Sequence, residues 1–181
     1  PYDPKTIDML FVTHAHIDHI GRIPKLCRSG FRGKIFSTLA TKELAEHMLA
    51  DSLSVLEKEE KRMGKPPLFD KEDIRKALSL WEVVPYHEVM PFDKEFSCTL
   101  RDAGHILGSA MIDIASGDKH LLFTGDLGNS PSPLMKDAEA VHDATYLVMD
   151  SVYGDRLHED AAQRKELLED VIEETVSRGG A

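Results

Sequence analysis

Hydrophobic and polar positions follow two different periods, and the period changes about half-way along the chain. The first half combines short apolar runs with stretches in which apolar residues recur every three or four positions. Short apolar runs are typical of buried strands, and the longer spacing is typical of amphipathic helices. We predict, in order, a strand at 7–13, a short helix at 20–30, a strand at 34–38, a helix from a cap at Thr41 to about Met63, and a helix at 70–81.

The second half has the texture of strands and turns. We predict strands at 82–90, 95–103, 109–115, 119–126 and 145–150, with a hairpin turn at Gly117-Asp118. Residues 159–178 return to helical spacing. They predict an acidic amphipathic helix whose buried face carries Leu168, Val171, Ile172 and Thr175.

The composition fits one globular domain with a core. The chain has 181 residues, of which 41% are hydrophobic and 30% are charged. Because no apolar run approaches the roughly 20 residues that a membrane span needs, no membrane partner is expected. Cys27 and Cys98 lie far apart and form no disulfide framework, which favours a cytoplasmic location.

The net charge of −10 by itself argues against a polyanionic substrate. The charge is uneven, however, because residues 1–36 carry six basic and three acidic side chains. A solvated basic face explains such an excess as well as a binding site does. The other residues of segment 1–36 therefore have to distinguish a solvated basic face from a binding site.

Residues 14–19 read HAHIDH, directly behind the apolar run Met9-Leu10-Phe11-Val12. His14 and His16 alternate along an extended segment, so both side chains reach one ion, while Asp18 and His19 follow where the chain turns and can face a second ion. Imidazole nitrogens with carboxylate oxygens suit Zn²⁺, with Mn²⁺ or Fe²⁺ as lesser options. No packing or turn preference calls for this spacing, so it predicts a metal site.

Two further predicted strand ends offer partners for this segment. His105 stands among the small residues of AGHILGSA, and Asp126 follows the buried run LLFTG. Small residues let the backbone approach a site closely, and a carboxylate at a strand end can bridge two cations. A lone strand-end histidine or aspartate is more often a turn or core residue. The remaining isolated histidines are accordingly expected to be structural or solvent-facing, namely His47, His87, His120 and His142.

Together these segments carry a resemblance to a known family. THAHIDH, AGHILGSA and TGD, in this order, resemble the second, third and fourth motifs of the metallo-β-lactamase superfamily. The resemblance implies an α/β (α+β) fold, the αββα sandwich, with a two-metal site at one edge of its sheets. The stretch DSVYGDRLH, residues 150–158, is similar to the signature of the β-CASP branch, whose members include ribonuclease J and the cleavage and polyadenylation endonuclease subunit.

The resemblance also implies a role for each matching residue. His14, His16 and His105 would hold a first zinc ion, Asp18 and His19 a second, and Asp126 would bridge the two. Asp150 stands where the branch has an accessory acid that orients a later catalytic histidine. It is Asp where Glu is frequent, and Val152 replaces the usual Thr.

The resemblance further implies that residues 1–158 form a partial metallo-β-lactamase domain that lacks N-terminal strands and its C-terminal half. Residues 159–181 would be a helix that leads into a β-CASP domain. A chain that begins at Pro1 and stops before the late histidines of the family is expected to be a fragment without activity of its own. Open strand edges leave a homodimer as an option.

The chemistry implied is hydrolysis of phosphodiesters in RNA, expected to be single-stranded. Asp18 is a candidate to take the proton of the attacking water, and Arg22, Lys25 and His158 are candidates for contacts with substrate. Three alternatives stay open at this point. They are a thioesterase or lactamase on the same fold, a flavodiiron-type redox enzyme, against which His16 argues, and a non-catalytic scaffold subunit.

Overall fold

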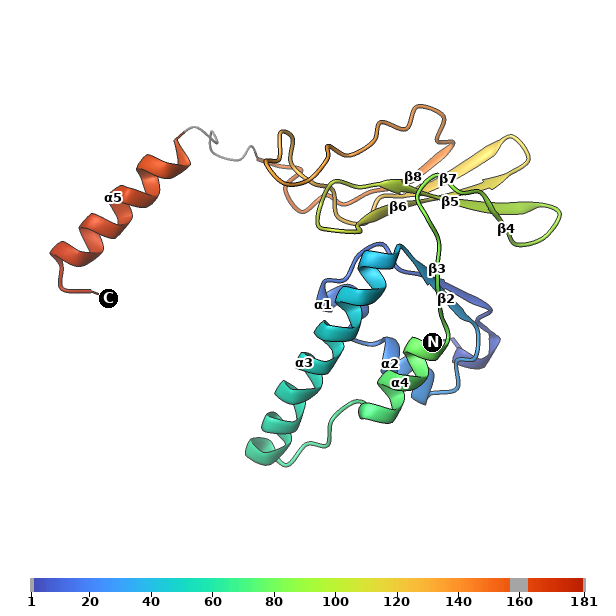
Figure 1. Cartoon of the computed structure of the whole chain (residues 1–181), viewed down its shortest axis with the longest axis horizontal. Helices are drawn as coiled ribbons and strands as arrows, with labels where there is room; N and C mark the ends of the chain where they lie inside the picture. The colour runs from blue at the N-terminus through green and yellow to red at the C-terminus, as the bar shows by residue number, and fades with distance from the viewer. Residues whose placement is uncertain (1, 157–162, 181) are drawn as a thin grey trace. The chain divides into compact units, whose positions relative to one another are not determined.

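The computed structural model describes residues 2–156 and 163–180, which belong to two compact units, one up to Asp150 and one from Ser151 onward. The predicted domain boundary after residue 158 falls between the described ranges and stays a prediction. The first unit contains, in chain order, η1 (Pro4–Thr6), β1 (Met9–Phe11), α1 (Ile17–Ile20), α2 (Ile23–Arg28), β2 (Lys34–Ser37), α3 (Leu39–Met63), α4 (Lys71–Ser79), β3 (Trp81–Val83), β4 (Met90–Pro91), β5 (Phe96–Asp102), β6 (Ala110–Ser116), β7 (Lys119–Phe123) and β8 (Tyr146–Val148) (Figure 1). The second unit contains α5 (Arg164–Ser177).

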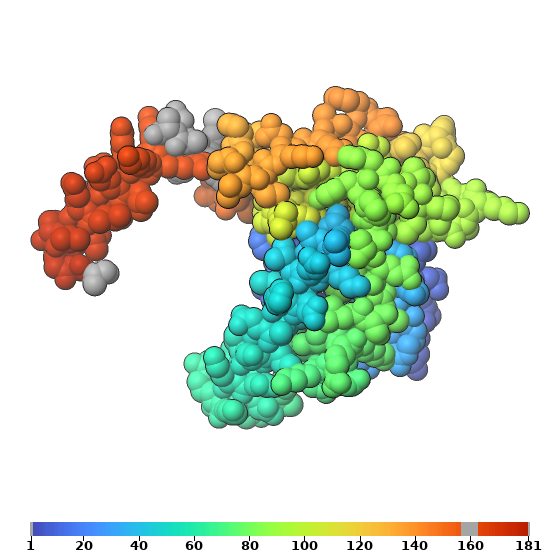
Figure 2. All heavy atoms as spheres, in the orientation of Figure 1, coloured from blue at the N-terminus to red at the C-terminus, as the bar shows by residue number. Residues whose placement is uncertain are grey.

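A three-stranded parallel sheet, in the order β1-β2-β3, carries helices on one face. Ile35 and Trp81, register partners on β2 and β3, pack with the apolar faces of α2, α3 and α4. Figure 2 shows α3 and α4, coloured cyan to green, side by side on the surface of this unit. Phe36, next to Ile35, points to the opposite face because successive strand residues alternate.

A five-stranded sheet, in the order β4-β5-β6-β7-β8, forms the next layer. Its strands pair antiparallel from β4 to β7, and β8 pairs parallel with β7. A second core fills the space between the two sheets, where Phe36 of the first sheet packs with Leu100 and Ile112 of the second. On the outer face, a third cluster joins Met111 and Leu122 to Leu127, Val141 and Ala144.

The first unit is therefore layered as helices, parallel sheet and mixed sheet. This confirms the predicted α/β class and is consistent with a partial metallo-β-lactamase-type sandwich. The strand predictions over 95–103, 109–115 and 119–126 correspond to β5, β6 and β7. The hairpin at Gly117-Asp118 joins β6 to β7, with Gly117 at φ +59°.

Two helix starts differ from the prediction. Thr38, and not Thr41, caps α3, and its hydroxyl accepts a hydrogen bond from the backbone N–H of Thr41. Thr38 leaves β2 in an extended conformation, which is the backbone state of an N-cap. The single helix expected at 20–30 is two helices, because the chain turns after Ile20 and restarts as α2, with Pro24 in its first turn.

The helix predicted at 70–81 ends earlier, at Ser79. Asp70 and Asp73 form a reciprocal capping box at its start. Trp81 belongs to β3 instead, where its ring lies in the helix-side core and its Nε1–H donates to Ser37 Oγ at 2.8 Å. The strand expected over 82–90 is interrupted by a turn at His87, whose φ is +64°.

The helix near the C-terminus forms over Arg164–Ser177, but its predicted buried face is wrong. Leu168, Val171 and Ile172 are each more than half exposed, and Thr175 is intermediate. The pattern correctly indicates an amphipathic helix, yet the described residues of its own unit provide no cover for its apolar side. Within those residues, no helix is both long enough and apolar enough to span a membrane.

Candidate metal centre

Three loops that leave strands bring the predicted ligands together where the two sheets meet. His14 and His16 follow β1, His105 lies in the loop from β5 to β6, and Asp126 follows β7. A hydrogen bond from the Ala110 N–H to the Thr13 carbonyl, 2.7 Å long, ties the first loop to the start of β6. The site therefore depends on the contact between the sheets.

Four side chains converge on one point. His14, His16, His105 and Asp126 each offer one ligand atom, and these four atoms lie within 4.8 Å of one another. His14 Nε2 is 3.1 Å from His16 Nδ1, which is 3.2 Å from His105 Nε2. Three imidazole nitrogens and one carboxylate oxygen form a donor set that fits a tetrahedral Zn²⁺ ion. The predicted first ligand set is thus assembled in space.

The two oxygens of Asp126 face different neighbours. Oδ2 lies 3.6 Å from the Nε2 atoms of both His14 and His105, whereas Oδ1 lies 3.4 Å from His19 Nε2. His19 Nε2 also lies 3.6 Å from Asp18 Oδ2. The residues predicted for a second ion therefore adjoin the first set, with Asp126 between them. This second group is more open, because the Asp18 side chain is 76% exposed.

Burial keeps the innermost imidazoles neutral. Burial, together with the charge of the nearby His19, lowers the pKa of His14 from 6.5 to about 4. Burial also lowers the pKa of His105, although the Asp126 carboxylate opposes this shift. A neutral imidazole presents a lone pair to a cation, so the cluster is ready to bind metal near pH 7.

Comparison with known families decides what this cluster belongs to. The family model described as "Metallo-beta-lactamase superfamily domain" matches residues 3–151, which include every residue of the cluster. The chain belongs to the metallo-β-lactamase superfamily. Membership implies divalent-metal binding, in agreement with the His/Asp cluster.

Individual relatives indicate which branch of this superfamily the chain resembles. Ribonuclease TTHA0252 of Thermus thermophilus is 34% identical over 179 residues, which are 99% of this chain and 39% of the relative. Cleavage and polyadenylation specificity factor subunit 3-I of Arabidopsis thaliana is 33% identical over 98% of this chain and 25% of its own length. Endoribonuclease YSH1 of Kluyveromyces lactis is 30% identical over 99% of this chain and 24% of its own.

These relatives confirm the predicted resemblance to the β-CASP branch of RNA-processing nucleases. The chain spans about two fifths or less of the length of the relatives named above.

The other predicted site residues of this metallo-β-lactamase domain lie outside the cluster or beyond the described part. The Asp150 backbone N–H donates to Thr124 Oγ1 at 3.1 Å, and its carboxylate favours the charged form of His105. Arg22 and Lys25 are exposed at the start of α2, eight and eleven positions after His14. The predicted substrate contact of His158 lies outside the described residues.

Two of the isolated histidines contact acidic side chains that lie outside the cluster. His87 Nε2 lies 2.7 Å from Glu139 Oε1, and His120 Nδ1 lies 3.0 Å from Asp113 Oδ1.

Sequence reasoning missed one residue beside the ligands. Thr13 Oγ1 lies 3.1 Å from His14 Nδ1, and its place as the first residue of the motif THAHIDH was the only sequence signal of a role.

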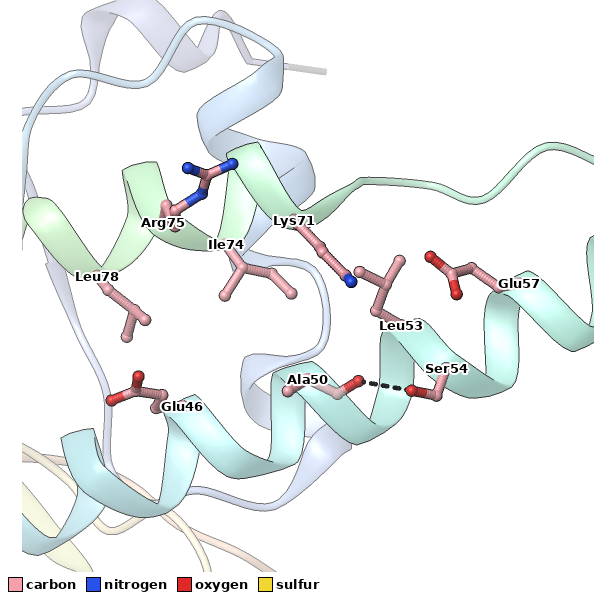
Figure 3. A pocket seen from close by; sticks show the side chains of 9 residues that line it. All are labelled: Glu46, Ala50, Leu53, Ser54, Glu57, Lys71, Ile74, Arg75 and Leu78. Atoms are coloured by element: carbon pink, nitrogen blue, oxygen red, sulfur yellow. Dashed lines mark hydrogen bonds between the residues drawn. The ribbon is translucent and has the colours of Figure 1, made fainter.

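A groove between α3 and α4, about 340 Å³ in volume, is separate from this chemistry (Figure 3). The side chains of Leu53, Ile74 and Leu78 lie along it, with acidic residues on α3 and basic residues on α4 beside them. It is lined by none of the cluster residues and by no histidine or cysteine. The groove therefore offers no competing centre for metal chemistry.

Proposed function

We propose that this chain is the metal-binding part of an RNA nuclease that uses two zinc ions. The observation that carries the proposal is the position of Asp126, with one carboxylate oxygen toward His14 and His105 and the other toward His19. The names of the relatives, which include a ribonuclease and an endoribonuclease, support RNA as the substrate. We take the RNA to be single-stranded when it is cut.

When bound, zinc would lower the pKa of a coordinated water to about 7 and supply positive charge near the phosphate. The residues of the chain supply the ligands for the ions. His14, His16 and His105 with Asp126 would hold the first ion, and Asp18 and His19 with Asp126 would hold the second. Asp126 would then be shared between the two ions.

Asp18 is the proposed acceptor of the proton from the attacking water. Its exposed carboxylate lies beside His19, on the solvent side of the cluster. The water oxygen bonds to phosphorus, the proton passes to Asp18, and the bond from phosphorus to the leaving sugar oxygen breaks.

The substrate contacts belong to the same proposal. Arg22 and Lys25, exposed after the ligand loop, are proposed to contact phosphates, together with His158. Asp150, at the edge of the cluster, is proposed to orient the histidine that protonates the leaving oxygen.

The two cysteines are buried free thiols, which supports a cytoplasmic location. The exposed residues of β8, at the edge of the mixed sheet, support a homodimer, which sedimentation analysis of the purified protein tests.

The chain by itself is expected to be inactive, so cleavage of an end-labelled single-stranded RNA by the full-length protein, with and without a chelator, tests the function. We expect zinc-dependent cleavage that Asp126→Asn reduces by more than about 100-fold, because the shared ligand is changed. His47→Ala, a change of an exposed histidine on α3, is the matched control and should leave the rate unchanged. Hydrolysis of a thioester or a β-lactam in place of RNA would contradict the proposal and favour another hydrolase of this fold.

A further inference from the structure

Thr13 lies where the three ligand-bearing loops meet. It directly precedes His14 in the loop after β1. Its carbonyl accepts the Ala110 N–H at 2.7 Å, where the loop that carries His105 enters β6. Its side chain abuts Gly125, the residue before Asp126. One residue thus contacts the segments that supply every ligand of the first metal position.

The contact with Gly125 is close enough to fix the loop after β7. A Cβ placed on Gly125 would lie 2.7 Å from Thr13 Cβ and 2.8 Å from Thr13 Oγ1, so only glycine fits against this side chain. Gly125 also has φ +57°, which favours glycine independently of space. The β-branched side chain of Thr13 has few rotamers, and this packing leaves its hydroxyl a defined direction.

That hydroxyl faces the outward nitrogen of His14. Thr13 Oγ1 lies 3.1 Å from Nδ1, while Nε2 of the same ring points to the other ligands. For Nε2 to present its lone pair to a cation, the proton of the neutral ring has to sit on Nδ1, where it donates to Thr13. Within the described ranges, the outward ring nitrogens of His16 and His105 form no such hydrogen bond.

We propose that Thr13 is a positioning residue for the metal centre. It holds His14 in the tautomer and ring orientation that bind the first ion, and it keeps the Asp126 and His105 loops in register with that ring. The inference rests on the proposed metal-dependent function and adds a determinant of metal affinity. An outer hydrogen bond of this kind typically changes metal affinity 10- to 100-fold.

Cobalt(II) titration of the whole chain tests this role without any assay of activity, because the visible bands of bound cobalt report ligand geometry. Thr13→Val keeps the branched shape and removes the hydroxyl, whereas Thr13→Ser keeps the hydroxyl and removes the methyl group. Thr99→Val, in the middle of β5 opposite Asp113, is the matched control for the same substitution in a strand.

We expect Thr13→Val to bind Co²⁺ about 10- to 100-fold more weakly with altered bands, while Thr13→Ser and Thr99→Val stay within about threefold of the parent. Circular dichroism of the metal-free proteins checks folding. If Thr13→Val does not fold, Thr13→Ala replaces it, with the same expected loss.

Unchanged affinity in Thr13→Val, or an equal loss in Thr13→Ser, would overturn the role of the hydroxyl. A full-length protein that binds cobalt normally but leaves RNA uncut would instead count against the proposed function alone.

Discussion

Replacing Gly108 by alanine should destabilise the fold more than the change in backbone conformation alone explains. Gly108 has φ +83°, and an added Cβ would lie 2.7 Å from the backbone nitrogen of Thr41 and 2.8 Å from the Ala40 Cβ. The Gly108 carbonyl accepts hydrogen bonds from the hydroxyls of Thr38 and Thr41, at 2.7 and 2.8 Å. The substitution therefore strains the loop and pushes it away from the start of α3.

The magnitude follows from these contacts. A left-handed conformation costs a non-glycine residue about 1–2 kcal/mol. Each of the two hydrogen bonds adds about 1 kcal/mol if the loop moves. We expect Gly108→Ala to lose about 3–4 kcal/mol of unfolding free energy. At about 2–4 °C per kcal/mol for a domain of this size, its melting temperature should fall by roughly 10 °C.

Gly64→Ala is the matched control, because Gly64 has φ +69° and no atom within 4 Å of the added Cβ. It should lose only about 1–2 kcal/mol. Thermal unfolding of both variants, followed by circular dichroism, measures the difference. Equal losses in the two variants would refute the reasoning that contact between the Gly108 loop and α3 matters. Because His105 lies in the same loop, Gly108→Ala should also weaken metal binding.

Three other changes test separate parts of the structure, each by urea unfolding. Arg101→Met should cost about 2–3 kcal/mol, because Arg101 donates two hydrogen bonds to the buried Asp113 carboxylate, which then keeps only its contact with His120. Adding Asp113→Leu should recover part of the loss, and no recovery would contradict this. Trp81→Phe should lower the free energy of unfolding by about 1–2 kcal/mol, because the hydrogen bond from Trp81 to Ser37 is lost. A change near zero would show that this hydrogen bond does not stabilise the fold. Without metal, the folded-state pKa of His14, about 4, lies below its unfolded value, so stability should fall by up to about 3 kcal/mol as the pH drops from 6.5 to 4. His14→Gln should flatten that dependence, and an equal slope in both proteins would contradict it.

The strands of the two sheets could be predicted because most are short apolar runs bounded by turns. What the sequence could not decide were choices between neighbouring residues with similar preferences. Thr38 and Thr41 are both good caps, and only the extended exit from β2 selects Thr38. Trp81 continues the helical pattern, but its hydrogen bond to Ser37 and its burial under the helices place it in β3. In both cases tertiary contacts decide the outcome.

The convergence of His14 and His16 on one cluster could be predicted because the spacing of HAHIDH has no other structural explanation. His105 and Asp126 were weaker candidates as single residues and gained support from the resemblance to the family. Thr13 could not be found in this way, since its role depends on a ring nitrogen 3.1 Å away and on the packing against Gly125. The amphipathic pattern of α5 likewise predicts an apolar face but does not say what covers it.

The metal content of the purified protein, measured by elemental mass spectrometry, tests the central claim most directly. The parent protein should retain close to one zinc ion or more per chain, and His14→Ala/His16→Ala should lose it, while His47→Ala should retain it. A parent protein that stays free of metal in zinc-containing buffer, or a double variant that retains as much zinc as the parent, would contradict the assignment of these histidines as the metal centre.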